Sequence, residues 1–508
     1  MKNKFDFNEL FIYDLANNHQ GDLEHAKNII KSMGDMSKAA NIRATLKFQF
    51  RQLDTFIHPD YIDRQDIKHI PRFTSTALTK KDYKILTEEV KKNGLITMAT
   101  PFDEESVDVL LELDIELIKV ASCSALDRPL LERIAEVNKP VIVSTAGLSI
   151  DQIDRLVSFF HHKKVHFAIM HCVAIYPTLD EKLQLGHIAY LKSRFPDVPI
   201  GFSTHEDQDN YTPVGIAYAL GARLFERHVG IENKNYKLNA YSSRPDQIEK
   251  WIAAYKRAKA MCGGEHKPPA SMEEIDSLNS LKRGVFAKSS IKKGKTIKRE
   301  DVFFSMPIQE AQLTSENWHD SIVADADYNV NTPLNEHLAD HEVSKDELIY
   351  KVMLQVSGML NKARIFIGPE SSIEISHHYG IERFREFGAV IINCINREYC
   401  KKLLVVLPRQ KHPYHFHKKK EETFQLLSGD LEIELEGRQK KLQLGETFLV
   451  KQEEWHKFHS LDGAIVEEVS TTHYNNDSFY EDERIASLPR EKRKTQIPNW
   501  EAAIKNNF

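Results

Sequence analysis

The stretch ELIKVASCSALDRPLLERIAEVNKPVIVST (116–145) shows the pattern that decides the fold of the first half of the chain. Two short runs rich in β-branched residues, 116–121 and 140–145, flank a helix-like stretch over Pro129–Val137. The same alternation continues through six further strand-like runs, 11–16, 43–50, 95–100, 165–172, 198–203 and 222–229. Eight strands alternating with helices over about 250 residues predict an α/β fold, a closed TIM (β/α)8 barrel. A doubly wound open sheet is the alternative.

Polar residues follow a second pattern, because they fall at or near the ends of most of these runs. Lys47 and Lys119 are placed in this way, and so are His205 and His228. In a barrel the carboxyl ends of the strands meet at one mouth, so these residues become neighbours although they are far apart in the sequence. Lysines surrounded by serines suit a phosphorylated anion, and two neutral imidazoles can share a divalent metal. We therefore expect an anion site and a metal site at the mouth.

The composition bounds the class of protein. A chain of 508 residues is too long for one ordinary core and predicts roughly two to four domains. The net charge of -5 gives no reason to expect nucleic acid or a membrane as a partner, and no apolar run approaches the roughly 20 residues that span a bilayer. The N-terminus lacks the pattern of a signal peptide, and the five cysteines form no C-x-x-C pair. We expect a cytoplasmic enzyme or binding protein.

The chain divides into four predicted segments. A barrel domain occupies 1–265, a small domain 278–338, an all-β domain 340–490 and a polar tail 491–508. The stretch GGEHKPPAS (263–271) is rich in glycine and proline, which is typical of a linker. We therefore expect the barrel to be joined flexibly to the parts that follow it.

Eight short motifs of the barrel domain resemble the sialic acid synthase family in order and spacing. The motifs are DLANNHQGD (14–22), KFQ (47–49), TPFDEESVD (100–108), IKVASCS (118–124), VSTAGLS (143–149), MHCVAIYPT (170–178), GFSTHE (201–206) and FERHVG (225–230). The resemblance covers residues 1–338 and implies a TIM barrel followed by a small SAF (antifreeze-like) domain. It also implies an enzyme that condenses phosphoenolpyruvate with an aldose, giving a 3-deoxy-ulosonic (sialic acid-like) acid and phosphate.

The resemblance assigns roles to individual residues. His205 and His228 would hold Mn²⁺ or Mg²⁺. Asp14 stands where the family has a carboxylate that is usually Glu, and Gln49 lies beside the substrates. Asp246 matches a Pro-x-Asp-like segment loosely, and either aspartate would position the attacking water or move its proton. Six further residues would contact the substrates: Asn18, Lys47, Lys119, Ser122, Ser144 and Ser203.

Three positions depart from the family. Ala174 replaces a common Asn, Thr204 replaces a usual Asp, and Met306 replaces an Arg of the SAF domain that reaches a partner subunit's acceptor. We therefore expect the phosphoenolpyruvate half of the site to be kept and the acceptor to differ from N-acetylmannosamine; the sequence does not name the aldose. The family also implies at least a homodimer, in which the SAF domain caps the neighbouring barrel. A lyase that uses Lys119 in a Schiff base is an alternative chemistry.

A second set of metal ligands lies in and after PRQKHPYHFHKKKEETFQLLSG (408–429). Histidines two residues apart face the same side of a strand, and later residues complete a set suited to Mn, Fe, Ni or Zn. The three histidines and one carboxylate of this set are His415, His417, Glu422 and His456. Glu421 is the register alternative to Glu422. The spacing of these residues resembles the two cupin motifs and implies an all-β cupin barrel.

The wider stretch from 376 to 485 resembles the sugar-isomerase-like cupins related to D-lyxose isomerase. In these proteins a metal holds neighbouring sugar oxygens while a carboxylate moves a proton through an enediol. Glu467 or Glu468 would be that base. Lys419 or Lys420 would stabilise the developing oxyanion. We favour a bifunctional enzyme with a second sugar isomerase or epimerase activity; the alternative is a monofunctional synthase whose cupin is a non-catalytic sugar-binding or assembly module.

Overall fold

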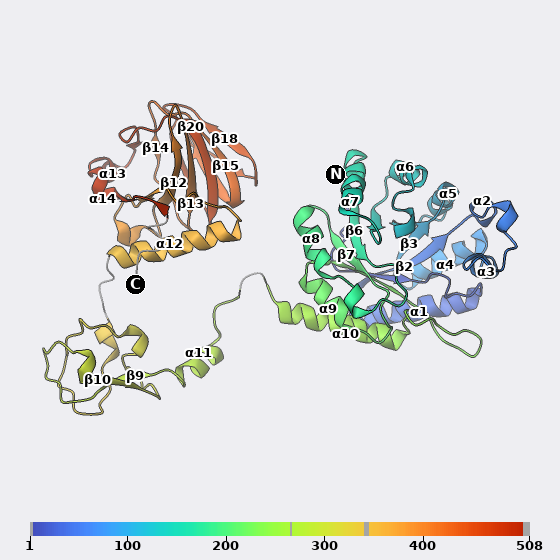
Figure 1. Cartoon of the computed structure of the whole chain (residues 1–508), viewed down its shortest axis with the longest axis horizontal. Coiled ribbons are helices and arrows are strands. Elements are labelled where there is room, and N and C mark those ends of the chain that lie inside the picture. Colours follow the sequence, from blue (N-terminus) through green and yellow to red (C-terminus); the bar gives the residue numbers. More distant parts are fainter. Residues whose placement is uncertain (1–3, 265–266, 340–344, 501–508) are drawn as a thin grey trace. The chain divides into compact units, whose positions relative to one another are not determined.

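In the computed structural model, which describes residues 4–264, 267–339 and 345–500, the eight strand-like runs of the first half close into a parallel barrel (Figure 1). The strands follow one another in sequence order, and the last pairs with the first, so that His228 lies beside Asp14. The strands are β1 (Leu10–Asp14), β2 (Arg43–Phe50), β3 (Ile96–Pro101), β4 (Leu117–Val120), β5 (Val141–Ser144), β6 (Phe167–Cys172), β7 (Ile200–Ser203) and β8 (Leu224–His228). This closure confirms the predicted TIM barrel and rules out the open sheet.

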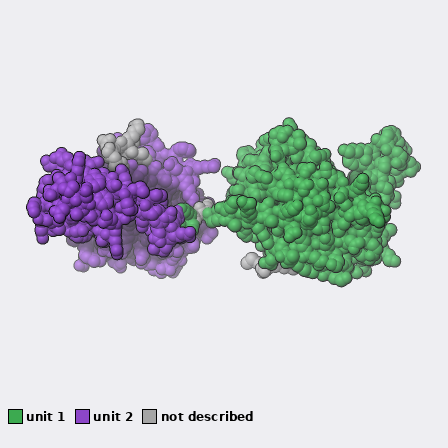
Figure 2. Space-filling model, turned by 90° about the horizontal axis from the view of Figure 1, so that it is seen from below, with its two compact units in different colours: residues 1–269 green, residues 270–508 purple. Residues whose placement is uncertain are grey.

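The chain divides into two units, residues 1–269 and residues 270–508 (Figure 2). The boundaries predicted at 265 and 340 lie outside the described residues, and so does the end of the predicted tail. Within the described ranges, no helix is both long enough and apolar enough to cross a membrane.

Helices follow the strands and cover the outside of the barrel (Figure 1). Thr79 and Ser149 each cap a helix by exchanging hydrogen bonds with its third residue, the capping box that Ser and Thr favour at helix starts. The longer helices are α1 (Leu23–Ala40), α4 (Lys80–Lys92), α5 (Glu104–Glu112), α6 (Arg128–Glu136), α7 (Ile150–His162), α8 (Gly186–Arg194), α9 (Thr212–Ala219) and α10 (Pro245–Cys262). Two short helices, α2 (Leu53–Phe56) and α3 (Ile70–Ser75), interrupt the connection from β2 to α4.

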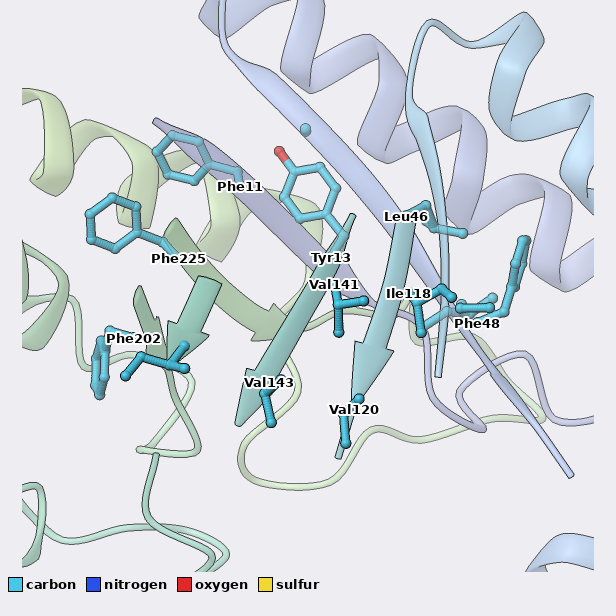
Figure 3. Close-up of a cluster of buried hydrophobic side chains, with 14 of the residues drawn as sticks. Phe11, Tyr13, Leu46, Phe48, Ile118, Val120, Val141, Val143, Phe202 and Phe225 are labelled. Atoms are coloured by element: carbon cyan, nitrogen blue, oxygen red, sulfur yellow. The ribbon is translucent and has the colours of Figure 1, made fainter. Parts of the chain in front are cut away.

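The strands bury both of their faces. Side chains such as Phe11 and Phe225 belong to the larger core between strands and helices (Figure 3), where Phe11 contacts the rings of Trp251 and Tyr255 of α10 edge to face. Residues on the alternate face, Ile12 among them, form a separate cluster inside the barrel. The barrel is therefore a packed core rather than a channel.

The interior face becomes polar toward the mouth. On β8, Leu224 of the interior cluster is followed two and four residues later by Glu226 and His228. On β1, Ile12 is followed by Asp14 in the same way. The same alternation places further side chains at the mouth: Lys47, Lys119, Ser144, Cys172 and Ser203. A polar layer thus closes the carboxyl end of an apolar interior.

A small domain follows the barrel. Its two strands, β9 (Gly284–Ala287) and β10 (Val302–Ser305), pair antiparallel. Buried side chains between Val285 and Leu334 form a cluster of their own. Helix α11 (Met272–Asn279) precedes it. This is the region where the sequence predicts the SAF domain, and the cluster shows that it packs around its own apolar centre.

The last part of the chain begins with helix α12 (Lys345–Lys362) and then consists mainly of β-strands. Its larger sheet has the strand order β18-β15-β20-β13-β12-β11-β22, and its smaller sheet has the order β17-β16-β19-β14-β21. The strands are β11 (Ser372–Ser376), β12 (Ala389–Asn396), β13 (Tyr399–Val406), β14 (His415–Phe416), β15 (Glu422–Gly429), β16 (Leu431–Leu435), β17 (Arg438–Leu442), β18 (Thr447–Val450), β19 (His456–His459), β20 (Ala464–Thr471), β21 (Phe479–Tyr480) and β22 (Lys494–Ile497). The two antiparallel sheets fit the predicted cupin fold.

Strand β22 lies beyond residue 490, where the sequence placed the start of a polar tail. It pairs antiparallel with β11, so that Ser376 lies beside Lys494 and Glu374 beside Gln496. The short helices α13 (Glu483–Ala486) and α14 (Arg490–Arg493) lead into it. The sheet therefore extends into the predicted tail and brings its charged residues next to β11.

Candidate functional site

Two buried lysines and two buried carboxylates lie together at the barrel mouth. Lys47 Nζ lies 2.5 Å from Glu226 Oε1 and 2.9 Å from Asp14 Oδ2. Lys119 Nζ lies 3.2 Å from Glu226 Oε2 and donates a hydrogen bond to Ser144 Oγ at 2.5 Å. The four charged side chains are at most 5% exposed. Glu226 therefore links two lysines that come from different strands.

The charges of this cluster oppose the effect of burial on its pKa values. Burial alone raises the pKa of the Glu226 carboxyl, but Lys119 and Lys47 outweigh it and hold that pKa well below its usual range. Burial alone lowers the pKa of the Lys47 ammonium, but Asp14 and Glu226 outweigh it and raise that pKa. For Lys119 burial prevails over Glu226, and its pKa is lowered. Glu226 and Lys47 thus form an ion pair at neutral pH.

The two predicted ligand histidines lie side by side, with ring centres 5.3 Å apart. His205 Nδ1 lies 2.9 Å from the backbone carbonyl of Val173, which assigns the proton to Nδ1 and leaves Nε2 free for a cation. His228 Nε2 lies 3.5 Å from Asp14 Oδ2. Burial lowers the pKa of His205 to about 3, so the ring is neutral, the form that binds metals. Two imidazoles beside a carboxylate fit a divalent cation such as Mn²⁺ or Mg²⁺.

Two more predicted residues lie near this cluster. Gln49 Nε2 is 3.4 Å from Asp14 Oδ2, at the long end of a hydrogen bond. Ser122 Oγ accepts a hydrogen bond from the backbone amide of Ala146 at 3.0 Å, which joins the loops after β4 and β5. Gln49 therefore contacts the carboxylate directly, while Ser122 holds the loop that follows Ser144.

Asn18 and Asp246 are placed differently. The Asn18 side-chain amide donates to the carbonyl of Val229 at 2.8 Å and to Ser242 Oγ at 3.0 Å, so it anchors the chain that follows β8. Asp246 lies in the first turn of α10, with a side chain 55% exposed and 3.2 Å from Arg244. Among the described residues, no hydrogen bond or ion pair joins Asp246 to the cluster at the mouth. Of the two predicted aspartates, Asp14 is the one that touches the candidate site.

Two interior residues were not among the predicted site residues. Glu226 links both lysines, and Cys172 lies on the same interior face, where burial raises the pKa of its thiol and the charge of Lys119 opposes that rise. The signal for both was strand alternation, since Glu226 precedes His228 by two residues. His171 lies at the end of a predicted strand, but its Nε2 faces the carbonyl of Leu183 at 2.8 Å, on the other face of β6.

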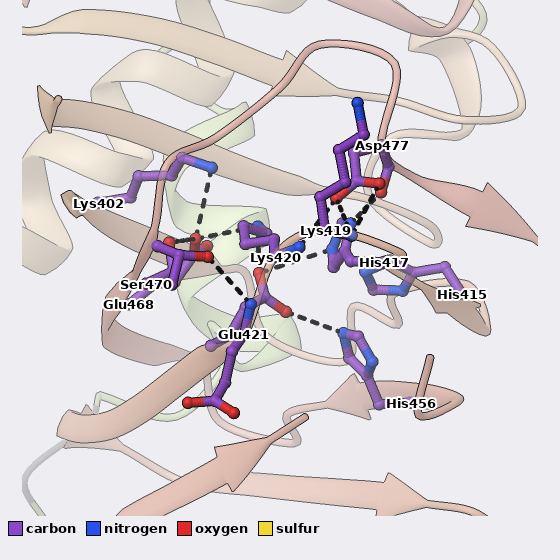
Figure 4. A network of polar contacts seen from close by, with 12 residues as sticks. Lys402, His415, His417, Lys419, Lys420, Glu421, His456, Glu468, Ser470 and Asp477 are labelled. Carbon is purple, nitrogen blue, oxygen red and sulfur yellow. Dashed lines mark hydrogen bonds and ion pairs between the residues drawn. The ribbon is translucent and has the colours of Figure 1, made fainter. Parts of the chain in front are cut away.

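The cupin region brings three histidines together (Figure 4). The ligand atoms of His415, His417 and His456 all lie within 4.8 Å of one another, and the three side chains are buried. Each ring turns its Nδ1 to a backbone carbonyl, and these carbonyls belong to Pro413, Asp477 and Glu454 respectively. This assigns the protons to Nδ1 and presents three Nε2 atoms as ligands, the arrangement that orients metal-binding histidines.

Glu422 completes the predicted ligand set. Its Oε2 lies 3.3 Å from His456 Nε2 and its Oε1 lies 3.6 Å from His417 Nε2. Both Glu422 Oε2 and His456 Nε2 are buried and have no hydrogen-bond partner among the described residues, which is costly unless a further group binds them. Lys420 also pairs with Glu422. Three imidazoles and one carboxylate fit a transition metal of the Mn, Fe, Ni or Zn type.

Strand alternation separates the predicted acid–base candidates, Glu467 and Glu468. Glu468 Oε1 points inward, 3.1 Å from Lys420 Nζ and 3.4 Å from Lys402 Nζ, and its side chain is 3% exposed (Figure 4). Glu467 points to the outer face, where it pairs with Lys401 at 2.6 Å. Only Glu468 of the two therefore lies beside the metal-ligand cluster.

The remaining register alternatives separate in the same way. Lys420 is buried, whereas Lys419 places its Nζ 5.1 Å from the centre of the Tyr474 ring. Glu422 is buried and Glu421 is exposed. The inward side chains are thus Lys420 and Glu422. Because positions 419 and 420 are both Lys, the sequence alone does not distinguish them, whereas the register of β15 does.

Comparison with known proteins gives two family matches. The NeuB family model matches residues 35–267, and the cupin domain model matches residues 402–469. A crystal structure of a protein from Chromobacterium violaceum, assigned to spore coat polysaccharide biosynthesis as protein E, is 42% identical, with a TM-score of 0.60, over 64% of this chain and 98% of that one. The N-acetylneuraminate-9-phosphate synthase of Drosophila melanogaster is 26% identical over 61% of this chain and 90% of its own length. The N,N'-diacetyllegionaminic acid synthase of Campylobacter jejuni is 28% identical over 56% of this chain and 86% of its own length.

Proposed function

Because this chain belongs to the NeuB family, with a cupin domain on its C-terminal side, we propose that its barrel condenses phosphoenolpyruvate with an aldose, giving a 3-deoxy-ulosonic acid and phosphate. The observation that carries this proposal is the pair of buried lysines, Lys47 and Lys119, at the same mouth as the two histidines. A substrate with a phosphate and a carboxylate needs such cations in a site that excludes water.

The residues of the barrel mouth have different proposed roles. Lys47, Lys119 and Ser144 bind the anionic groups, and Glu226 holds both ammonium groups in place before the anion arrives. The enol carbon of phosphoenolpyruvate attacks the aldehyde, water adds at the second carbon, and phosphate leaves. Asp14 lies 2.9 Å from Lys47 and 3.5 Å from His228, and it would hold that water and accept its proton. A divalent ion held by the histidines would polarise the aldehyde as a Lewis acid.

The acceptor is proposed only as an aldose. Two of the relatives named above are synthases of different products, N-acetylneuraminate 9-phosphate and N,N'-diacetyllegionaminic acid, and these names describe those proteins. Thr204 is buried here and its hydroxyl has no hydrogen-bond partner in the ranges that the structure describes, and Ala174 offers no polar side chain. Both positions therefore give the acceptor side fewer polar contacts than the Asp and Asn that the sialic acid synthase family carries there.

A phosphate-release assay with phosphoenolpyruvate and a panel of aldoses, with and without Mn²⁺, tests the barrel reaction. At least one aldose should release phosphate, and chelator should stop it. The variants His205→Ala and His228→Ala should each lose activity together with metal dependence. Full activity in the double variant would exclude this metal site, and trapping of substrate on Lys119 by borohydride would favour the Schiff-base lyase instead.

For the cupin we propose a metal-dependent isomerisation or epimerisation of a sugar, supported by Glu468 beside Lys420 and the three histidines. Glu468 would move the proton next to the carbonyl, and Lys420 would stabilise the oxyanion. A sugar-binding module without turnover is the second candidate, because a metal can also hold a diol.

Deuterium exchange separates the two cupin candidates. The full chain, incubated with aldoses or ketoses in D₂O, should incorporate deuterium next to the carbonyl. Glu468→Gln should lower this exchange by roughly 10²- to 10⁴-fold, the usual contribution of a general base. Glu467→Gln is the matched control, because its side chain lies on the outer face and pairs with Lys401. Metal and sugar binding without exchange across the panel would favour the binding module.

A homodimer is proposed as well. It rests on the family resemblance of residues 278–338 to the SAF domain and on the Gly/Pro-rich stretch at 263–271, which lets that domain reach a neighbouring barrel. Met306, at the position of the family's capping arginine, is 58% exposed and so is free to meet a partner. Sedimentation at micromolar concentration should show at least a dimer; a monomer alone would contradict the capping arrangement.

A further inference from the structure

The cupin metal ligands line a cavity between the two sheets that also contains three lysines. The cavity has a volume of about 40 Å³. Its lining includes His415 and Tyr480 from the smaller sheet and Glu422 from the larger one. The three lysines come from β13, from the residues just before β15 and from β22, and they are Lys402, Lys420 and Lys494. One of these cations therefore comes from the segment that the sequence placed in a tail.

Each of two carboxylates in this cavity is shared by two cations. Glu468 lies between Lys402 and Lys420, at 3.4 and 3.1 Å. Glu374 lies between Lys494 and Arg490, at 2.5 and 2.7 Å. Each cluster thus carries one positive charge more than it carries negative charges. Glu422, the third carboxylate, belongs to the metal ligands, and a divalent ion would outweigh its charge.

Glu374 acts as a support for Lys494. Besides the two cations, it accepts hydrogen bonds from Gln496 Nε2 at 2.6 Å and from Ser376 Oγ at 3.1 Å. Its oxygen atoms are therefore occupied, while an ammonium group has three protons and Lys494 uses one on Glu374. Lys494 can donate to a ligand without losing its place.

The surroundings of the cavity are positive in other respects. Burial, and then the charges of Lys402, Lys420 and Lys494, lower the pKa of His473, which also lines the cavity, to about 3. Arg493 lies with its guanidinium carbon 5.0 Å from the centre of the Tyr480 ring, and within the described part of the chain its buried Nε and Nη1 have no hydrogen-bond partner. A neutral ligand would leave this excess of positive charge unpaired in a place that water reaches poorly, which is unfavourable.

Resting on the cupin role proposed above, we propose that the cupin takes an anionic sugar, whose phosphate or carboxylate is bound by Lys494. The metal ligands and Lys494 belong to the same cavity, since both line it. The ring centre of Tyr480 lies 5.6 Å from that of His415, a metal ligand, and 5.0 Å from the guanidinium carbon of Arg493, the residue before Lys494. In the proposed complex the sugar binds the metal with its carbonyl end and the lysine with its anionic end.

The two sources of the anion place the cupin differently in a reaction sequence. A sugar phosphate would be a substrate prepared before the condensation. A carboxylate would be that of a 3-deoxy-ulosonic acid, the class of product that the barrel forms. The same cation serves both, so binding measurements have to compare them directly.

Calorimetric titration of the Mn²⁺-loaded full chain tests the proposal. The three probes are a neutral hexose, its 6-phosphate and a 3-deoxy-ulosonic acid. At least one anionic probe should bind roughly tenfold tighter than the hexose, the effect of one charge-assisted contact. Lys494→Met should remove that preference and leave hexose affinity and metal content unchanged. Lys494→Arg should keep the preference, and Lys492→Met, an exposed neighbour on α14, is the control.

The outcomes distinguish this inference from the cupin function on which it rests. Equal binding of the hexose and both anionic probes would overturn the anion site, while the metal-bound sugar site would stand. Anion preference that survives in Lys494→Met would also overturn it. Binding of none of the three probes, with metal present, would refute the sugar-binding role itself. Lys494→Met should fold, because Glu374 keeps Arg490, Gln496 and Ser376 as partners.

Discussion

Replacing Lys119 by alanine removes one side of the proposed phosphoenolpyruvate site. The change deletes an ammonium group that donates to Ser144 Oγ at 2.5 Å and lies 3.2 Å from Glu226. Glu226 keeps Lys47 at 2.5 Å, so no carboxylate is left without a cation. We therefore expect the variant to fold and to keep its metal, and its defect to appear in the use of the anionic substrate.

The expected size follows from burial and from the type of contact. A charge-assisted hydrogen bond contributes about 1.5–3 kcal/mol, which corresponds to a roughly 10- to 150-fold loss in kcat/KM. The side chain of Lys119 is 2% exposed, so salt should screen this contact little. The loss should appear with every active aldose, because the lysine binds the common substrate rather than the acceptor.

Initial rates of phosphate release, measured over a range of phosphoenolpyruvate concentrations with Mn²⁺ and one active aldose, provide the test. Lys92→Ala is the control, since this lysine at the end of α4 has a side chain 77% exposed. Wild-type kcat and KM in Lys119→Ala would refute the anion site. An equal loss in Lys92→Ala would show that the effect is not specific to the mouth.

Three further predictions concern buried ionisable side chains. Lys47→Ala should lower the free energy of unfolding by about 3–5 kcal/mol, because Asp14 loses its ammonium partner while Glu226 keeps one ammonium partner. A Tm equal to that of the wild type would contradict this. His456→Ala should lower the tightly bound metal by one ion per chain in elemental analysis of dialysed protein, and unchanged content would place that ion elsewhere. Burial lowers the pKa of His19 from 6.5 to about 4. As the pH falls, this histidine therefore binds a proton in the unfolded chain before it does so in the folded one. The free energy of unfolding should fall by up to about 3 kcal/mol as the pH drops from 6.5 to 4. His19→Gln should remove this pH-dependent contribution.

The barrel could be predicted from the sequence because its signal is local and repeated. Each strand is a short run rich in apolar residues, many of them β-branched or aromatic, and each run is followed by a helix or a loop. The number of such runs then implies closure, which the pairing of β8 with β1 confirms. Strand β22 carries little of this signal, since Ile497 is the one apolar residue among its four. It belongs to the sheet because Glu374, far away in the sequence, pairs with Lys494, and one sequence does not show that pairing.

The candidate sites likewise contain some residues that the sequence predicts and others that it does not. Residue types and spacings indicated the histidines and lysines, because metal ligands and anion-binding cations are chemically distinctive. The role of Asn18 could not be read in this way, since its amide is used by Val229 and Ser242, which lie after the last barrel strand. Adjacent glutamates such as Glu467 and Glu468 were also equivalent in the sequence. The register of β20 distinguishes them, because it turns one outward and the other into the cavity.

The two sites, on unrelated folds, share one electrostatic arrangement. In each, a buried carboxylate is shared by two lysines beside a group of histidines: Glu226 in the barrel and Glu468 in the cupin. A buried lysine without a partner would lose its proton, since burial disfavours the charged form. In each site a second carboxylate, Asp14 or Glu422, pairs with one of the two lysines and also lies beside a candidate metal-ligand histidine. A divalent ion there would offset that second negative charge, so the site would keep both ammonium groups in place and still favour a negative ligand.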